Sequence, residues 1–311
     1  ADPAADGAGA ESAAQPADDG QSVYKVATVA NEGVDQELPK DSDGYTLLKS
    51  DEDLAACLHA STKPDRLRLA ADISSSESIT IGQNTTIDLA GHKLYYPVGD
   101  NGTFITVASG ALTVEDSARV SDTPSVVDND PGKRATMAWT GDNKGTPQSL
   151  TYYETTSAPN ADTLGTTTAE TTTEHVVSGF GAIVAASDRG SVKQVISVED
   201  GGTLNLSGGM ITTPRTLGDN GHVIFSQGAV NISGGYVTNG NGGGWGGGLC
   251  MAKGSLNMTD GVIAANKAAA GGGIFADNSV TLTLSGGVIS GNATYAKGIG
   301  AVSYTHLRAL S

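Results

Sequence analysis

The chain has 311 residues, of which 38% are hydrophobic, 5% are aromatic and 43 are glycine, and its formal net charge is −16. So few large apolar side chains disfavour a compact α/β enzyme of this length and favour a fold whose thin core is built from small and β-branched residues. The sequence has no clustered basic face for nucleic acid and no apolar run long enough to span a bilayer, so we expect no nucleic-acid partner and no membrane span.

The N-terminal residues 1–43 are acidic and rich in small side chains, and they start with ADPAADGAGAESAAQPADDG. Residues 1–53 hold thirteen acidic and three basic side chains, whereas residues 195–302 hold five acidic and four basic ones. A tract of this composition cannot bury enough apolar area to order itself, so residues 1–43 are predicted to be a disordered acidic spacer. The tract resembles the segment left after signal-peptide removal in exported bacterial proteins, which predicts a secreted or cell-surface location.

Residues 44–64 are predicted to form an N-terminal cap. Ser50 and Asp53 form a capping box, and Leu54, Cys57 and Leu58 follow at helical spacing. We therefore expect a short amphipathic helix that covers the otherwise exposed end of the core.

Residues 65–120 contain the first copies of an internal repeat, in ITIGQNTTIDLAGHKL and FITVASGALTVEDS. Residues 121–194 interrupt this repeat with a threonine-rich stretch, TTSAPNADTLGTTTAETTTEH, which is too long and too polar for a tight corner. We interpret residues 121–194 as an insertion, in which the short strands TMAW and SLTYYE are candidates for a hairpin.

Residues 195–302 carry the repeat in its regular form, because LNLSGG, VNISGG, LNMTDG and LTLSGG follow one another at steps of 26 residues. Three aligned columns are apolar and the column between the first two is polar, which indicates strands with one buried face. The apolar columns are Leu204, Val230, Leu256 and Leu282; Leu206, Ile232, Met258 and Leu284; and Ile211, Val237, Ile263 and Ile289. Each repeat is thus predicted to be one turn of a solenoid, in which like side chains stack at about 4.8 Å.

The corners of the predicted solenoid are marked by glycine and asparagine. Asn266 and Asn292, also 26 residues apart, suit a corner because asparagine tolerates the left-handed conformation and stacked amides can hydrogen-bond between turns. Cys57 and Cys250 would lie ~20 Å apart in this arrangement, beyond disulfide reach, so both are expected to be reduced and buried.

The repeats resemble a known family. SITIGQNTTIDLAGHKL, FITVASGALTVEDS and the LxLSGGxI units followed by N...GGGI are similar to right-handed parallel β-helix domains of bacterial surface and adhesin-like proteins, which have the pectate-lyase-like superfold. The resemblance covers residues 65–120 and 195–302. It implies an all-β fold, namely a right-handed single-stranded parallel β-helix solenoid with about 26 residues per coil, a short N-terminal capping helix and one long inserted excursion.

The same superfold hosts lyases, glycosidases and non-catalytic stalks, so the resemblance does not decide the activity. The repeats contain neither the carboxylate pair of a glycosidase nor clustered aspartates for calcium, and only Gly221, His222 and Val223 resemble a motif of the polygalacturonase-like enzymes. We therefore expect no catalytic residue, metal site or cofactor, and His222 is expected to be a surface histidine at a corner. A non-catalytic rigid stalk or adhesive surface, with a candidate glycan-binding face, is favoured. The alternatives are a fragment of a polysaccharide lyase or glycoside hydrolase, and a purely structural stalk that binds nothing.

Trp245 and Tyr236 are the candidate ligand-binding residues, because an exposed aromatic ring can stack on the apolar face of a sugar. Trp245 lies in NGNGGGWGGGLC, which lacks the Lys-Ser/Thr of a phosphate loop and the aspartate of a calcium-binding nonapeptide and is predicted to be a corner. Tyr236 belongs to the column Met210, Tyr236, Val262 and Val288, which either forms an exposed apolar stripe or is covered by a flanking loop or by the insertion. The expected partner is a carbohydrate or a host-surface glycoprotein.

Residues 303–311 break the repeat with a tail that looks foreign to it. We expect the natural chain to continue with further repeats beyond this point.

Overall fold

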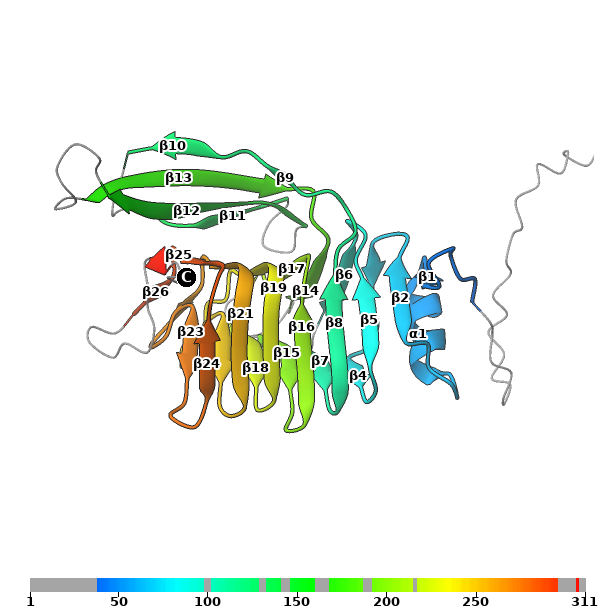
Figure 1. Ribbon diagram of the computed structural model, residues 1–311. Coiled ribbons are helices and arrows are strands. Elements are labelled where there is room, and N and C mark those ends of the chain that lie inside the picture. The colour runs from blue at the N-terminus through cyan, green and yellow to red at the C-terminus, as the bar shows by residue number, and fades with distance from the viewer. Residues whose placement is uncertain are drawn as a thin grey trace, which may run out of the picture. The chain divides into compact units, whose positions relative to one another are not determined.

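The computed structural model describes residues 38–97, 102–128, 133–140, 146–159, 168–186, 192–214, 217–295 and 306–307. The prediction of an all-β chain is confirmed, because these ranges hold one helix, α1 (Asp51–His59), beside strands that mostly pair in parallel (Figure 1). Of the spacer predicted for residues 1–43, positions 1–37 lie outside the described residues, as does most of the 303–311 tail. In the described ranges, no helix is both long and apolar enough to cross a membrane.

Helix α1 begins at a capping residue. The backbone of Ser50 is extended and its hydroxyl accepts a hydrogen bond from the Asp53 N–H at 3.3 Å, while the Asp53 carboxylate accepts one from the Lys49 N–H at 2.8 Å. The first contact satisfies a backbone donor that the first turn of a helix leaves free, and the second ties the residue before the N-cap to that turn. The helix buries Leu54 and Cys57 against the main core.

The large sheet has fourteen strands within the described residues and contains two series of parallel strands. The strands of the first series are β1 (Thr46–Leu48), β2 (Arg66–Leu69), β5 (Thr85–Asp88), β8 (Gly110–Glu115), β16 (Gly202–Leu206), the first halves of β19 (Ala229–Thr238) and β21 (Ser255–Ala264), and β24 (Thr281–Leu284). Those of the second series are β3 (Ile73–Ser74), β6 (Lys93–Pro97), β14 (Ala182–Ala186), β17 (Met210–Thr212), the second halves of β19 and β21, and β25 (Val288–Ser290), with β27 (His306–Leu307) antiparallel to β25.

A six-stranded sheet forms the remaining side of each repeat. Its strands are β4 (Ile79–Ile81), β7 (Gly102–Val107), β15 (Val192–Val198), β18 (Leu217–Ser226), β20 (Leu249–Met251) and β23 (Ile274–Ala276). A two-stranded sheet pairs β22 (Lys267–Ala268) with β26 (Ala293–Thr294). The chain visits the first series, the second series and the six-stranded sheet in turn, and then returns to the first series one strand further along.

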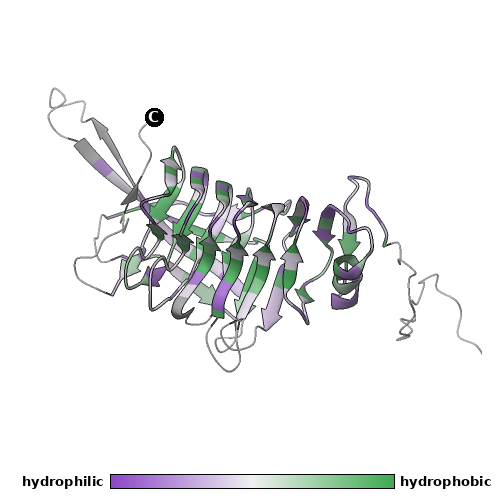
Figure 2. Ribbon diagram, turned by 90° about the horizontal axis from the view of Figure 1, so that it is seen from below, coloured by the Kyte–Doolittle hydropathy of each residue, from purple (hydrophilic) through white to green (hydrophobic). Residues whose placement is uncertain are grey.

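The register of the large sheet places aligned residues of the sequence repeat side by side. Leu204 pairs with Val230, Val230 with Leu256, and Leu256 with Leu282, and the other two apolar columns pair in the same way. All members of the Leu204 column except Leu282 are at most 1% exposed, whereas Leu282 on the terminal strand is 37% exposed. Apolar and polar bands accordingly recur at corresponding places on neighbouring strands (Figure 2).

An ionic cluster ties the first strands of the large sheet together. Arg68 donates from Nη1 to the carboxylates of Asp41 and Asp43 and from Nε to Asp88 at 2.7 Å, and its guanidinium lies 4.1 Å from the centre of the Tyr45 ring. Burial by itself raises the pKa of Asp88, but hydrogen bonds from Ser117, from Arg68 and from the Ala90 N–H outweigh it and hold that pKa below its ordinary value.

The inserted sheet leaves the repeat after β8 and returns at β14. It contains β9 (Ser121–Asp122), β10 (Ser125–Val127), β11 (Thr136–Trp139), β12 (Pro147–Pro159) and β13 (Thr168–Ser178), all antiparallel. The TMAW and SLTYYE segments form the antiparallel pair β11 and β12. Because this sheet leaves at a corner, Val114 of β8 still pairs with Leu206 of β16, and the ladder continues without interruption.

Candidate functional site

The outer face of the six-stranded sheet carries a row of aromatic side chains. Phe225 of β18, Cys250 of β20 and Phe275 of β23 pair in register, while the neighbouring Ile224 and Leu249 point into the main core. Phe225 and Phe275 are partly exposed and Cys250 is 5% exposed between them. The repeat thus provides an apolar patch on this face, away from the core.

Trp245 lies on this patch. Its ring stacks on Phe275 with centroids 5.1 Å apart and an angle of 14° between the planes, and 59% of the residue is exposed. The backbone of Trp245 pairs with Ala270 of the next repeat, and Gly246 packs so closely on Cys250 that an added Cβ would lie 2.8 Å from the Cys250 Cα. The indole is therefore exposed on one side and supported on the other, which presents a flat aromatic face to solvent.

His222 supports the same loop from below, and the expectation of a surface histidine was wrong. It lies on β18, is 5% exposed, and stacks on Phe225 with centroids 5.6 Å apart. Its Nδ1 donates to the carbonyl oxygen of Gly246 at 3.0 Å. Burial lowers the pKa of His222, so the imidazole is neutral at physiological pH and acts as a fixed hydrogen-bond donor to the loop that carries Trp245.

The glycines around Trp245 are required by close contacts within this loop and with the next one. A Cβ at Gly240 would lie 2.0 Å from the carbonyl oxygen of Gly247 in the same loop, and one at Gly247 would lie 2.4 Å from that of Lys267 in the next loop. The same loops are joined by backbone hydrogen bonds, including Gly242 N–H to Lys267 O at 2.9 Å and Gly248 N–H to Gly272 O at 3.1 Å. NGNGGGWGGGLC is thus a stacked loop whose glycines permit backbone contact.

Asn266 and Asn292 stack at the base of these loops and are 1% and 4% exposed. The Asn266 side chain donates to Asn292 Oδ1 at 3.0 Å and to Val237 O at 2.9 Å, and it accepts from the Gly240 N–H at 2.9 Å. The left-handed residue at this corner is the one before each asparagine, for example Ala265 with φ of 59°. The expected role of asparagine in the left-handed conformation was therefore wrong, whereas its amide does bridge successive repeats.

Tyr236 lies on a different face and beneath the inserted sheet. It packs in an apolar cluster with Met210, Val262 and Leu150, and its ring lies 6.1 Å from that of Phe180. Burial raises the pKa of Tyr236 to about 12. Of the two alternatives for this column, the covering by the insertion is the one that the structure shows. Tyr236 is consequently not part of the exposed surface around Trp245.

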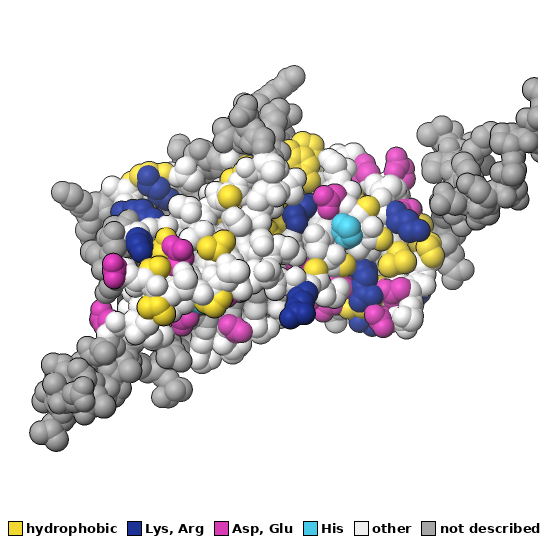
Figure 3. Space-filling view, turned by 90° about the horizontal axis from the view of Figure 1, so that it is seen from above, with side chains coloured by type: hydrophobic (Ala, Val, Ile, Leu, Met, Phe, Trp, Pro, Cys, Tyr) yellow, Lys and Arg dark blue, Asp and Glu magenta, His cyan; other side chains and the backbone are white. Residues whose placement is uncertain are grey.

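The inserted sheet also holds a polar group of side chains. His175 Nδ1 lies 2.8 Å from Asp122 Oδ2, its Nε2 lies 3.6 Å from Glu154 Oε2, and its ring stacks on Tyr152 with centroids 4.7 Å apart. This group braces strands β9, β12 and β13. On the face that carries the inserted sheet, basic and acidic side chains are interspersed among uncharged ones (Figure 3). Within the described ranges, no group of three or more His, Cys, Asp or Glu side chains could hold a metal ion.

Comparison of the chain with protein-family models finds no match. Comparison with curated proteins finds none either, and comparison with solved structures likewise finds none. The functional argument therefore proceeds from the residues of this chain.

Proposed function

We propose that the chain is a non-catalytic segment of a secreted or cell-surface, adhesin-like bacterial protein, and that it folds as a right-handed single-stranded parallel β-helix with about 26 residues per coil. Pairing of residues that are 26 apart supports the coil length, as in the side-chain bond from Asn231 Nδ2 to Asn205 Oδ1. The visiting order of the three strand series supports the single-stranded winding. The pectate-lyase-like superfold remains part of this proposal.

The stalk role is supported by the way in which each repeat contacts only its neighbours. Each repeat pairs with the repeats before and after it through parallel strands, so an array lengthens by about 4.8 Å per turn without a new kind of contact. The stacked asparagines and glycine loops restrict sliding between turns, which favours a stiff rod. Repetition of this kind suits a spacer that holds a binding surface away from a cell.

Carbohydrate binding is proposed for the surface around Trp245, with a glycan polymer or a host-surface glycoprotein as the partner. The observation that carries this proposal is the 59% exposure of an indole that is stacked on Phe275. Exposing so large an apolar ring costs solvation free energy, roughly 2 kcal/mol relative to full burial. A sugar ring stacked on the free face would recover part of it, and neutral His222 adds no charge to the site.

The test is a glycan array followed by titration of the hits, with the Trp139→Phe variant as the starting protein. The chain has two tryptophans, so this variant leaves Trp245 as the single indole, and its emission reports on ligand contact. The expected result is binding that shifts this emission and whose affinity, measured by titration calorimetry because Trp245→Ala removes the last indole, falls at least tenfold in Trp245→Ala. Binding that Trp245→Ala leaves unchanged would show that the proposed surface is wrong.

A reducing-end assay on the same glycans separates the two classes of function. Binding without release of new reducing ends supports the adhesive role. Turnover would overturn the non-catalytic proposal and favour the alternative, a polysaccharide lyase or glycoside hydrolase fragment.

A further inference from the structure

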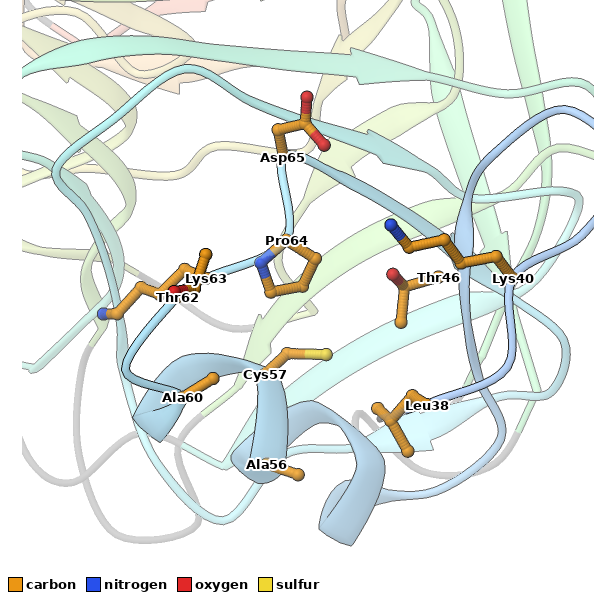
Figure 4. A pocket seen from close by; sticks show the side chains of 10 residues that line it. All are labelled: Leu38, Lys40, Thr46, Ala56, Cys57, Ala60, Thr62, Lys63, Pro64 and Asp65. Atoms are coloured by element: carbon orange, nitrogen blue, oxygen red, sulfur yellow. The ribbon is translucent and has the colours of Figure 1, made fainter. Parts of the chain in front are cut away.

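The cavity at the N-terminal cap does not select a class of ligand. It has a volume of about 570 Å³ and is enclosed by residues 38–46, by the C-terminal half of α1 and by residues 60–65 (Figure 4). Lys40 and Asp65 both line it, so their charges balance, and the ammonium end of Lys63 points away from the centre. The stacked glycine-rich loops of the repeat hold a more selective arrangement of side chains.

A second exposed aromatic side chain lies beside the loop that carries Trp245. Tyr295 directly follows β26 and is 50% exposed, and its backbone N–H donates to the Ala268 carbonyl at 2.9 Å. The Tyr295 hydroxyl donates to Asn241 Oδ1. The Lys267 ammonium lies 4.1 Å from the centre of the Tyr295 ring. The ring therefore lies across the Lys267 loop and reaches the start of the loop that contains Trp245.

The two aromatic side chains mark opposite ends of one stretch of loop. Asn241, the partner of the Tyr295 hydroxyl, pairs with Lys267 of the next loop. Trp245 pairs with Ala270, three residues further along that next loop. Three extended residues span about 10 Å, so the Tyr295 hydroxyl and the Trp245 backbone are held about this distance apart.

The floor between these ends consists of backbone and methyl groups. Residues 242–244 are all glycine, and residues 268–270 of the next loop are all alanine. Gly243 is exposed and Gly244 is partly exposed. On these two stretches no side chain longer than a methyl group stands between the aromatic rings, so one ligand can contact both. Lys267, which is exposed, adds a hydrogen-bond donor at the Tyr295 end.

This arrangement fits a chain of sugars better than a protein segment or a single sugar. Protein interfaces gain most of their affinity where an aromatic or arginine anchor fills a desolvated pocket. A glycine floor has no side chains to wall such a pocket. Sugar rings instead present flat apolar faces for stacking on aromatic rings, with hydroxyl groups at their edges. One pyranose ring covers one aromatic side chain, whereas a chain of linked rings extends over both.

We propose that this surface binds an extended β-1,4-linked glycan chain, with one sugar ring stacked on Trp245 and another on Tyr295. The sugars between them lie over Gly243 and Gly244, and a hydroxyl group accepts a hydrogen bond from Lys267. An extended chain keeps both ring contacts, whereas a coiled chain curves away from one of them. This inference rests on the carbohydrate binding proposed for Trp245 and narrows it to a chain that covers about 10 Å.

The test is a titration with two oligosaccharide series built from the same sugar, followed by Trp245 emission in the Trp139→Phe background. Cellobiose through cellohexaose are extended β-1,4-linked glucose chains, and maltose through maltohexaose are their coiled α-1,4-linked counterparts. Affinity is expected to rise about tenfold from cellobiose to cellohexaose, because the second stacked ring adds a contact within the same complex. The maltose series should show no such rise with length.

Substitutions of Tyr295 separate its ring from its hydroxyl. Tyr295→Ala is expected to abolish the rise, so its affinity for cellohexaose falls about tenfold while its affinity for cellobiose is unchanged. Tyr295→Phe keeps the ring and should keep the rise. Leu282→Ala is the matched control, because it shortens another exposed apolar side chain of the same repeat, 37% exposed, on the first series of the large sheet. It should bind both series like the starting protein, and circular dichroism is used to confirm that all three variants are folded.

The outcomes separate this inference from the carbohydrate proposal. An equal rise in the maltose series, no rise in the cellobiose series, no binding of either series, or a full rise in Tyr295→Ala would each overturn the extended-chain inference. None of these outcomes overturns the carbohydrate proposal, which is decided by the glycan array and by Trp245→Ala.

Discussion

Replacing Gly247 with alanine tests whether the glycines around Trp245 are there for close packing. The new Cβ would lie 2.4 Å from Lys267 O and 2.8 Å from Gly272 O. Both contacts are backbone atoms, so no side chain can rotate away. These oxygens also accept hydrogen bonds from Gly242 N–H and Gly248 N–H, which would lengthen if the loops moved apart. Overpacking costs about 1–3 kcal/mol, and the rigid contacts place this variant near 3 kcal/mol.

The matched control is Gly82→Ala, in the connection between β4 and β5. A Cβ there meets nothing within 4 Å, so the substitution introduces no clash. It should stabilise the protein by about 0.4–1 kcal/mol, because alanine lowers the conformational entropy of the unfolded chain. Both free energies of unfolding are measured by urea titration in the Trp139→Phe background, with Trp245 emission as a probe two residues from the change. If Gly247→Ala alters the free energy by less than about 0.5 kcal/mol, as ordinary surface changes do, the loops are not packed as described.

Three further changes probe other contacts. Asn266→Ala should lower the free energy of unfolding, measured by urea titration, by about 2–3 kcal/mol, because the buried Gly240 N–H and Val237 carbonyl lose their hydrogen-bond partner. Asn257→Ala, at an exposed position, should change this free energy little. Because the pKa of Asp88 is lowered in the folded state, its carboxylate stabilises the fold above a pH of about 4, and this contribution is lost as the pH falls further. In Asp88→Asn, the free energy of unfolding should therefore fall less steeply below a pH of about 4. Phe180 is buried in the apolar cluster that joins Leu150 of the inserted sheet to Met210 of the large sheet, so Phe180→Ala should cost about 3–5 kcal/mol and speed proteolysis of the inserted sheet. Unchanged proteolysis would show that Phe180 does not hold the inserted sheet in place.

The features that sequence reasoning found are those encoded locally or by repetition. Alternation of apolar and polar residues around Leu206 and Ile232 indicated strands, and the constant step of 26 residues indicated which positions pair. The capping residues Ser50 and Asp53 marked the start of α1 because an N-cap is a contact between residues three apart. Such signals survive in a single sequence because each contact involves residues that are close in the chain or aligned in the repeat.

The features that escaped sequence reasoning depend on contacts without a period. Tyr236 has the same sequence context as Met210 and Val262, and only the fold of a polar, threonine-rich insertion decides that all three are covered. The sequence around His222 indicates an exposed corner, and only the folded position of the loop containing Gly246 shows that this histidine is buried. The signal that could have found it is the alignment of Phe225 and Phe275 on either side of Cys250, since a row of outward apolar side chains needs a cover.

The prominence of Trp245 comes from a single extra residue in its loop. Asn241 pairs with Lys267 and Trp245 pairs with Ala270, so four steps along one loop match three steps along the next. The carbonyl of Gly244 accepts hydrogen bonds from the N–H groups of both Ala269 and Ala270, which marks where the longer loop bulges. A bulge in a stacked array must point outward, because the inward side is filled by the core. The irregularity that breaks the repeat is therefore what presents the indole. If the proposed adhesive role holds, further binding surfaces are best sought where the loop length changes and the strand pairing does not.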